Sequence, residues 1–221
     1  MGFWGTFIVT RADQSLTELA ALVPAADMIG WHGRGSDGWQ AVQVSNGPQG
    51  WDSSALPAAW EGTLRALMEQ GGHPVIASTI LDSDCGQLIG YSPKAGRWGG
   101  WLRLKTALDY IDRTVSQGDE GTIWWDSGGQ IHAMDEELTD ERRERYQRRY
   151  DAALARFITV GPDAEGAAPL AVSWASEAGL QPDPAAVLAA LKSSEAFAEI
   201  QFFRLIAALG VPEITSGGAS A

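Results

Sequence analysis

The first 81 residues alternate between segments typical of β-strands and segments typical of helices. Apolar, β-branched stretches predict the strands, and the box Ser15-x-x-Glu18 predicts the start of the first, short helix. In the second helix, apolar residues recur at helical spacing after Ser53 and Ser54 and end at Gly71-Gly72. The predicted strands are Gly2–Arg11, Met28–Gly33, Trp39–Val44 and Pro74–Leu81. The order βαββαβ predicts an α+β fold, a ferredoxin-like antiparallel sheet with helices on one face.

Two more strand patterns extend this sheet, and the rest of the chain is predicted to be helical. The extra strands are Gln87–Ser92 and Trp98–Arg103, and a helix follows from Leu104. A loop-like insertion is expected at Gly118–Gly129, and a linker or exposed loop at Gly161–Pro169. Helices are expected from Thr139 to Phe157, around Trp174, after the cap Asp183, and from Glu195 to Leu209. The expected division is a sheet domain at 1–133, a helical part at 134–212 that packs on the same core or stands apart, and a disordered tail at 213–221.

The composition is that of an acidic protein, and this charge favours either solubility in general or a basic protein partner. The chain has 221 residues, a net charge of −12 and 45% hydrophobic residues, which is enough for a proper core. This charge repels phosphates and anionic lipids, so we expect no nucleic-acid or membrane partner. Because Cys85 is the single cysteine, no internal disulfide forms, and a cytoplasmic location is expected. No signal peptide and no apolar run of membrane-spanning length is apparent, and the residue bias is typical of bacteria.

The stretch ILDSDCGQL places Asp82 and Asp84 directly after a predicted strand. Asp-x-Asp after an apolar strand resembles the first motif of haloacid-dehalogenase-type phosphatases, but no later Gly-Asp-x-x-x-Asp supplies magnesium ligands. Asp82-x-Asp84-x-Gly86 also starts like a calcium loop, but Pro93 stands where that loop requires a bidentate glutamate. A turn between two strands is therefore the preferred interpretation, and it could form part of an acidic binding rim.

Other sequence patterns give no catalytic or metal site. Trp125–Gly129 resembles the Gly-Asp-Ser-Gly-Gly of trypsin-like proteases, but Trp125 replaces the first glycine and no matching histidine surroundings exist. The three histidines lack partners at ligand spacing, and no nucleotide-binding glycine pattern occurs. We therefore expect no cofactor and no metal. The five arginines in Glu141–Asp151 are interpreted as a solvated helix face with pairs such as Glu144 with Arg148.

Tryptophans and acidic side chains together suggest a protein-binding surface. Strand alternation in RWGGWLRL puts Trp101 between two arginines on one face, so an exposed aromatic is expected there. Trp124 and Trp125 follow the acidic pair Asp119 and Glu120, and adjacent tryptophans do not easily share one core. The alternative is that these tryptophans fill a seam between sheet and helices. The partner-binding candidates are Trp101, Asp119, Glu120, Trp124, Trp125, Asp126, Asp82 and Asp84.

Three hypotheses of function remain open at this level. The first is a small acidic interaction protein, of the immunity or antitoxin type, that masks a basic partner. The second is an enzyme with an unfamiliar carboxylate site around Asp82, Asp84 and Asp126, which the missing catalytic partners disfavour. The third is a small-molecule binder with a tryptophan-lined pocket.

Overall fold

The computed structural model describes residues 2–45, 56–108, 123–125, 131–133 and 139–216. The chain divides into two compact units, one formed by Met1–Arg103 with Val160–Ala221 and one formed by Leu104–Thr159. The expected division at residue 133 therefore falls inside the smaller unit. The last three helices belong to the larger unit, together with the sheet.

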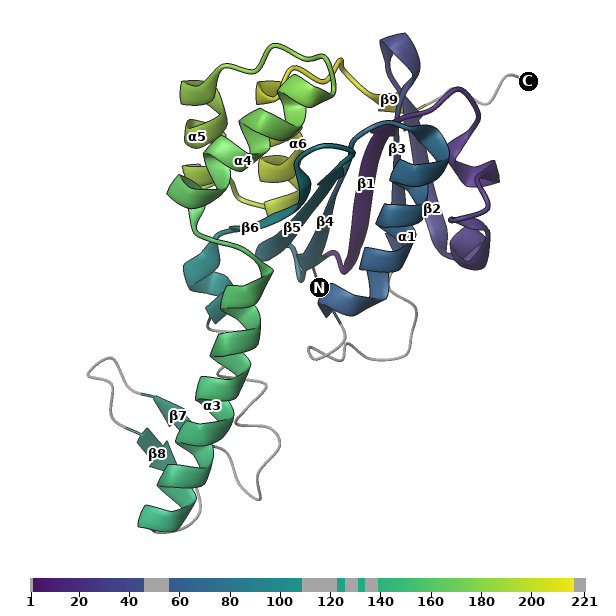
Figure 1. Cartoon of the computed structure of the whole chain (residues 1–221). Helices are drawn as coiled ribbons and strands as arrows, with labels where there is room; N and C mark the ends of the chain where they lie inside the picture. Colours follow the sequence, from purple (N-terminus) through teal and green to yellow (C-terminus); the bar gives the residue numbers. More distant parts are fainter. Residues whose placement is uncertain (1, 46–55, 109–122, 126–130, 134–138, 217–221) are drawn as a thin grey trace. The chain divides into compact units, whose positions relative to one another are not determined.

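Within the described residues, seven strands form one antiparallel sheet in the larger unit, in the order β6-β5-β4-β1-β3-β2-β9 (Figure 1). The fold is thus α+β, as predicted, and its sheet is more extended than a four-stranded arrangement. Every predicted strand is present with boundaries shifted by a few residues. The strands are β1 (Gly5–Arg11), β2 (Ile29–Arg34), β3 (Trp39–Ser45), β4 (Val75–Leu81), β5 (Cys85–Ser92), β6 (Gly96–Leu102) and β9 (Thr215–Ser216).

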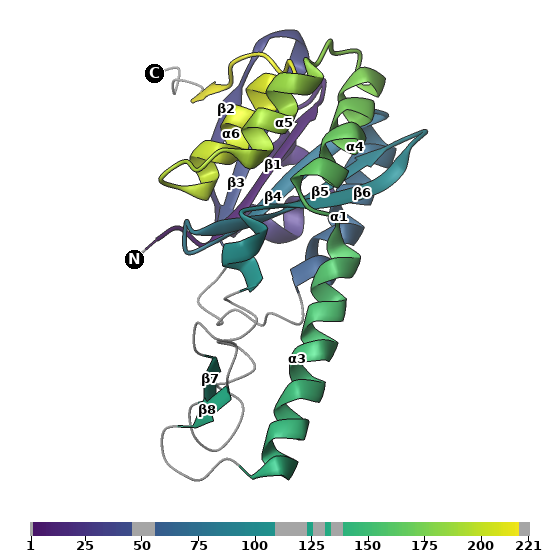
Figure 2. The same ribbon diagram turned by 90° about the vertical axis from the view of Figure 1, so that its left-hand side faces the viewer.

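Helices cover both faces of this sheet (Figures 1 and 2). Because side chains alternate along a strand, neighbours in β1 enter different cores: Phe7 lies in the core beneath the C-terminal helices and Ile8 in the core beneath α1. One face is covered by α1 (Leu56–Gly71) and the 3₁₀ turns η1 (Leu16–Glu18) and η2 (Val23–Met28). The other face of the sheet is covered by α4 (Ala164–Glu177), α5 (Pro184–Lys192) and α6 (Ala198–Ala208). The 3₁₀ turn η3 (Ser36–Gly38) joins β2 to β3.

The first crossover differs from its prediction. Instead of one capped helix it forms two 3₁₀ turns, and the side chain of Ser15 caps neither. The buried side chain of Gln40 on β3 forms hydrogen bonds with backbone groups of this segment. Its amide nitrogen donates to the carbonyl oxygens of Ala12 (2.9 Å) and Gln14 (2.7 Å), and its oxygen accepts from the N–H of Leu16 (3.1 Å). A distant side chain therefore fixes this segment, and local sequence could not reveal it.

The expected loop at Gly161–Pro169 is wrong for most of its length, because α4 begins at Ala164. Asp163 caps the helix by accepting from the N–H of Gly166 at 3.0 Å. The chain approaches β6 so closely here that a Cβ atom on Gly161 would lie 2.2 Å from the carbonyl carbon of Gly99. A glycine is therefore required at this point.

The smaller unit contains α3 (Asp140–Val160) as far as Thr159, and a hairpin of β7 (Ile123–Trp125) and β8 (Ile131–Ala133). The strand β7 lies inside the segment Gly118–Gly129, where a loop-like insertion was expected. The backbone N–H of Arg142 donates to the hydroxyl of Thr139 at 3.3 Å, as an N-cap does, and the predicted pair of Glu144 with Arg148 is present at 3.6 Å on the exposed face. The predicted helix is confirmed and extends three residues further.

Thr215–Ser216 pairs with β2 at Gly33–Arg34, so the start of the expected disordered tail is a short strand. Residues 217–221 lie outside the described residues.

Candidate interaction surface

The aspartates of ILDSDCGQL lie in the turn between β4 and β5, as predicted. Asp82 (φ 51°) and Ser83 (φ 59°) both adopt the left-handed conformation, and the N–H of Asp84 donates to the carbonyl oxygen of Leu81 at 2.9 Å. Successive left-handed residues match the twist of a hairpin, and aspartate tolerates this conformation better than most residues do.

This turn holds the N-terminal segment in place. The carboxylate of Asp82 accepts hydrogen bonds from the N–H of Gly2 (2.7 Å) and the indole N–H of Trp4 (3.1 Å). The hydroxyl of Ser83 accepts from the N–H of Phe3 (2.8 Å), and the N–H of Ser83 donates back to the carbonyl oxygen of Phe3 (3.0 Å). Asp82 and Ser83 therefore position the aromatic side chains that precede β1, a role that does not require a catalytic carboxylate.

The same turn fixes the beginning of α6. The carbonyl oxygen of Ser83 accepts from the N–H of Ala198 (2.8 Å), and its hydroxyl donates to the carboxylate of Glu199 (2.9 Å). A carboxylate in the first turn also suits the positive end of the helix dipole. The N-terminal segment and the start of α6, which are almost 200 residues apart in the sequence, thus meet at one turn.

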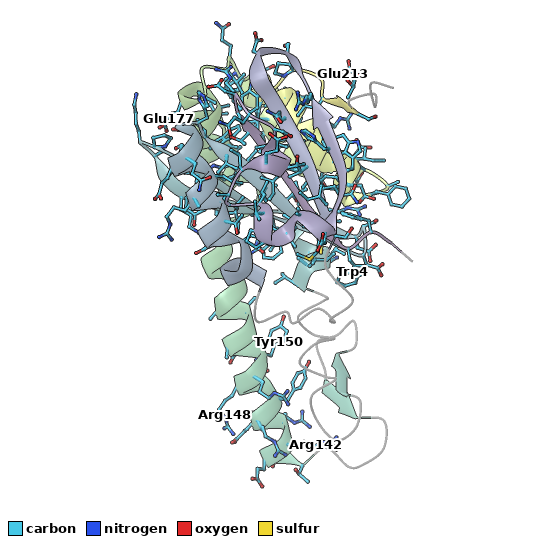
Figure 3. All side chains as sticks on the ribbon, turned by 90° about the vertical axis from the view of Figure 1, so that its right-hand side faces the viewer. Trp4, Arg142, Arg148, Tyr150, Glu177 and Glu213 are labelled. Carbon is cyan, nitrogen blue, oxygen red and sulfur yellow. The ribbon has the colours of Figure 1, made fainter. Side chains whose placement is uncertain are left out.

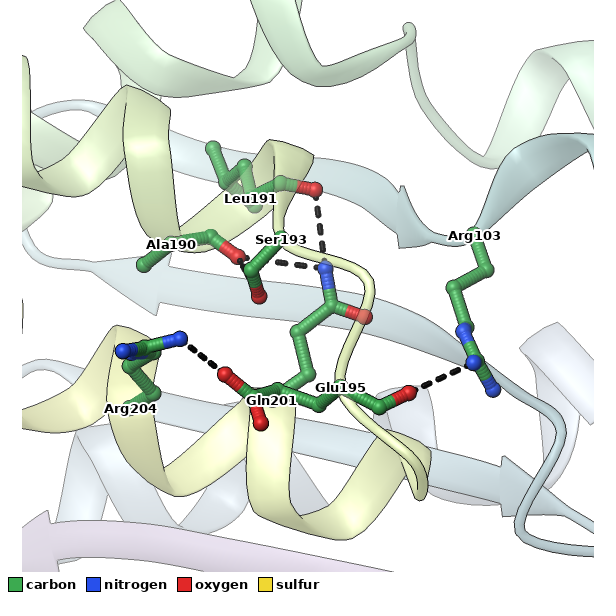
Figure 4. Close-up of polar contacts among 7 residues, drawn as sticks. All are labelled: Arg103, Ala190, Leu191, Ser193, Glu195, Gln201 and Arg204. Carbon is green, nitrogen blue, oxygen red and sulfur yellow. Dashed lines mark hydrogen bonds and ion pairs between the residues drawn. The ribbon is translucent and has the colours of Figure 1, made fainter.

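Arg103 joins this turn to the loop before α6 (Figure 4). Its guanidinium donates to the carbonyl oxygens of Asp84 (2.8 Å) and Glu195 (2.6 Å), and the carboxylate of Glu195 pairs with Arg204. The buried amide of Gln201 donates to the last carbonyl oxygens of α5, at Ala190 (3.1 Å) and Leu191 (2.9 Å). These bonds join α6 to α5, and the loop before α6 to the turn after β4.

Held in this way, α6 presents an apolar stripe to solvent. Phe197 is 50% exposed and Ile200 is 47% exposed, and with the half-buried Phe203 they follow at intervals of three residues on one side of the helix. The opposite side of α6 carries Phe202 and Leu205, which are fully buried. Both sides of the helix are therefore apolar, and only one of them faces the core.

Ring contacts extend this stripe toward the N-terminal segment and the edge of the sheet. The rings of Phe203 and Trp31 lie 6.2 Å apart between centroids, and the ring of Phe7 lies 5.0 Å from Phe203 and 5.2 Å from Phe3. Phe3 and Trp31 are half-buried. We call the five partly exposed residues the α6 apolar surface: Phe3, Trp31, Phe197, Ile200 and Phe203.

A cavity of about 290 Å³ lies beside this surface, between α6 and the segment that leads to β9. Apolar residues dominate its lining, and the charged residue among them is the exposed Glu213, at the periphery of the larger unit (Figure 3). The lining residues are Phe203, Ile206, Ala207, Val211, Pro212, Glu213 and Ile214. Phe203 belongs to both the surface and the cavity, so the two are continuous.

A second cavity, of about 440 Å³, lies between the first crossover and the end of α1. Its lining carries the carboxylates of Asp13 and Glu18 and the amides of Gln14 and Gln70. Neither cavity has a tryptophan in its lining, so the tryptophan-lined pocket of the third hypothesis finds no counterpart in either.

The structure places the predicted site residues in three groups. Asp82 and Asp84 lie in the turn described above. The expected exposure of Trp101 is wrong, because its side chain is only 2% exposed and residues 98–102 of β6 are all buried. Trp124 and Trp125 belong to β7, but their side chains lie outside the described residues, as do Asp119, Glu120 and Asp126.

The residues of the α6 apolar surface were not among the candidates. The sequence around Phe202-Phe203 is apolar on nearly every side, which predicts burial, and the structure buries Phe202 but leaves Phe203 partly exposed. One signal was available: Phe197 precedes the helix at the N-cap, where Ser, Thr, Asp or Asn is preferred.

None of the helices in the described part of the chain is both long and apolar enough to cross a membrane. Among the same residues, no three His, Cys, Asp or Glu side chains gather where they could hold a metal ion. Comparison of the chain with protein-family models, curated proteins and solved structures gives no match.

Proposed function

We propose that this protein is an interaction protein that binds a basic protein partner through the α6 apolar surface. The observation that carries the proposal is the exposed stripe of Phe197 and Ile200 on a helix whose other face is already buried. Contiguous exposed apolar side chains are costly in a monomer and mark sites of association. Aromatic side chains also supply much of the energy of protein interfaces.

The charge of the chain supports a basic partner. A net charge of −12 accelerates the approach of a positively charged protein and repels an acidic one. This combination of acidic charge and exposed apolar side chains suits a protein that masks a basic partner, a role of the immunity or antitoxin type. We infer a role of that kind, in the cytoplasm, for this protein.

The hydrogen bonds beneath the surface also favour binding. Asp82, Ser83 and Arg103 hold both the N-terminal segment and the start of α6, and a surface held in place before binding loses less conformational entropy on association. The use of Asp82 and Ser83 in this framework weighs against the alternative of a carboxylate enzyme site.

We also infer that β1 to β4 and their two crossovers form a ferredoxin-like core, which β5, β6 and β9 extend.

The proposal is tested by capturing partners from the native lysate with the full chain as bait. The decisive variant is Ile200→Arg, which places a cation in the stripe, and the matched control is Leu170→Arg on α4, where the side chain is 41% exposed. Loss of a hot-spot contact weakens an interface by at least about 2 kcal/mol, which is about thirtyfold in Kd.

We expect one basic protein to be retained by the unchanged chain and by Leu170→Arg, to be lost with Ile200→Arg, and to be released by high salt. Equal retention by Ile200→Arg, or retention of acidic proteins alone, would contradict the proposal.

A further inference from the structure

The cavity beside the α6 apolar surface has the size of one large side chain. An apolar cavity of about 150 Å³ holds a benzene molecule, and pockets for drug-sized ligands start at about 300 Å³. At about 290 Å³ and open to solvent, this cavity is large enough for an aromatic or long aliphatic side chain with its backbone outside. The apolar lining by Phe203, Ile206 and Ile214 matches such an occupant.

The charge of Glu213 at the edge of the cavity indicates which residue of the partner should lie next to the inserted side chain. Glu213 is the charged residue of the lining, and no cation lines the cavity beside it. Between Glu195 and Ser216 the sequence contains one basic residue, Arg204, and its side chain already pairs with Glu195. Arg34 lies opposite Thr215 in the sheet and does not belong to the lining. A cationic group beside the cavity would therefore meet an acidic surface.

We infer that this cavity receives one aromatic or large aliphatic side chain of the partner, and that Glu213 pairs with an arginine or lysine adjacent to it. The partner motif is thus an apolar residue next to a basic residue. The inference rests on the proposed function, because it names the part of the partner that the α6 apolar surface recognises. Phe203 links the two, since it contributes to both.

A dipeptide titration tests the inference without requiring the natural partner. Phe-Arg amide is added at millimolar concentration to the full chain and followed by backbone amide chemical shifts in NMR spectra, with Phe-Glu amide as the charge-reversed probe. We expect Phe-Arg amide to shift the amides of Ala207, Glu213 and Ile214. The shifts with Phe-Glu amide should be much weaker, because its carboxylate meets Glu213.

Three variants locate the binding. Ala207→Phe fills the cavity from an exposed position and should abolish the shifts, whereas the control Ala189→Phe, at an exposed alanine of α5, should leave them unchanged. Glu213→Gln removes the rim charge and should weaken Phe-Arg amide on the order of fivefold at low salt, with little effect at high salt.

Equal shifts with both dipeptides, no shift at all, or shifts that persist in Ala207→Phe would overturn the inference. Shifts of the same amides on simple dilution would assign the cavity to a second copy of this chain and would also overturn it. If Ala207→Phe still captures the basic protein that Ile200→Arg loses, the proposed function stands and this inference alone fails.

Discussion

At the scale of single residues, Trp174 attaches α4 to the sheet. Its side chain is fully buried, and its indole N–H donates to two strand carbonyl oxygens, those of Val75 and Tyr91, each at 3.1 Å. The indole N–H of Trp98 is also buried, but it has no hydrogen-bond partner in the described part of the chain. Two tryptophans in the same core therefore differ in whether their polar atom is satisfied.

This difference predicts unequal effects of the same substitution. Trp174→Phe removes two hydrogen bonds and leaves two buried acceptors, so it should lower the free energy of unfolding by at least about 1 kcal/mol more than Trp98→Phe does. Trp98→Phe is the control because it removes a similar area of ring without a hydrogen bond. Chemical denaturation measures both, with the slope checked for constancy. Equal losses would contradict the anchoring role.

At the scale of elements, the three C-terminal helices begin in different ways. Asp163 caps α4, and Asp183 caps α5 by accepting from the N–H of Ala185 at 2.9 Å. The N-cap of α6 is Phe197, which forms no side-chain cap and is half exposed. A residue that is poor for helix stability and exposed to solvent is consistent with selection for binding.

Phe197→Ser separates these two roles. The new cap should offset the lost contacts of the half-exposed ring, so the free energy of unfolding should change by no more than about 0.5 kcal/mol, while partner binding weakens. Asp183→Ala is the matched control, since it removes a true cap and should cost about 1 kcal/mol without affecting binding. A stability loss in Phe197→Ser as large as that of Asp183→Ala would show that the ring is needed for the fold.

Glu177 joins the end of α4 to the turn between β5 and β6. Burial opposes its ionisation, but its carboxylate accepts from the backbone N–H groups of Lys94 (2.6 Å) and Ala95 (3.2 Å), and the net effect lowers the pKa of Glu177. The hydroxyl of Ser92 also favours the anion, although its geometry falls short of a hydrogen bond.

The hydrogen bonds of the Glu177 carboxylate predict that the stability of the fold depends on pH. Because the pKa of Glu177 is lower in the folded chain than its ordinary value of 4.5, its contribution is complete above pH 4.5 and is lost as pH falls through the folded value. The loss should be at most about 1 kcal/mol, since the group is partly exposed. Denaturation of Glu177→Gln between pH 6 and pH 3 should show a flatter dependence than the unchanged chain. Parallel curves would assign the acid sensitivity to other carboxyl groups.

At the scale of the whole molecule, the elements with strong local signals were predictable. Alternating apolar patterns located the strands, Asp183 with Pro184 located the start of α5, and Thr139 located the start of α3. These signals act within a few residues of each other. The turn at Asp82 was also predictable, because its residue types bend a chain wherever they occur.

Features that depend on distant contacts were not predictable. Gln40 organises the first crossover from 24 residues away, and Asp82 binds groups 80 and 78 residues away, at Gly2 and Trp4. Trp101 alternates like a surface residue, but residues 98–102 of β6 are all buried. For α6 the sequence was apolar all round, and only packing decides which side stays exposed.

The position of the binding surface is the central claim, and hydrogen exchange of the complex tests it most directly. Backbone amide exchange is compared for the full chain alone and bound to the basic protein captured in the lysate experiment. We predict slower exchange in Phe197–Ala207 and along Ile29–His32 at the edge of the sheet, with α1 and the crossover near Asp13 unchanged. Protection around Asp13–Ala20, or in α3, with none in α6 would contradict the claim.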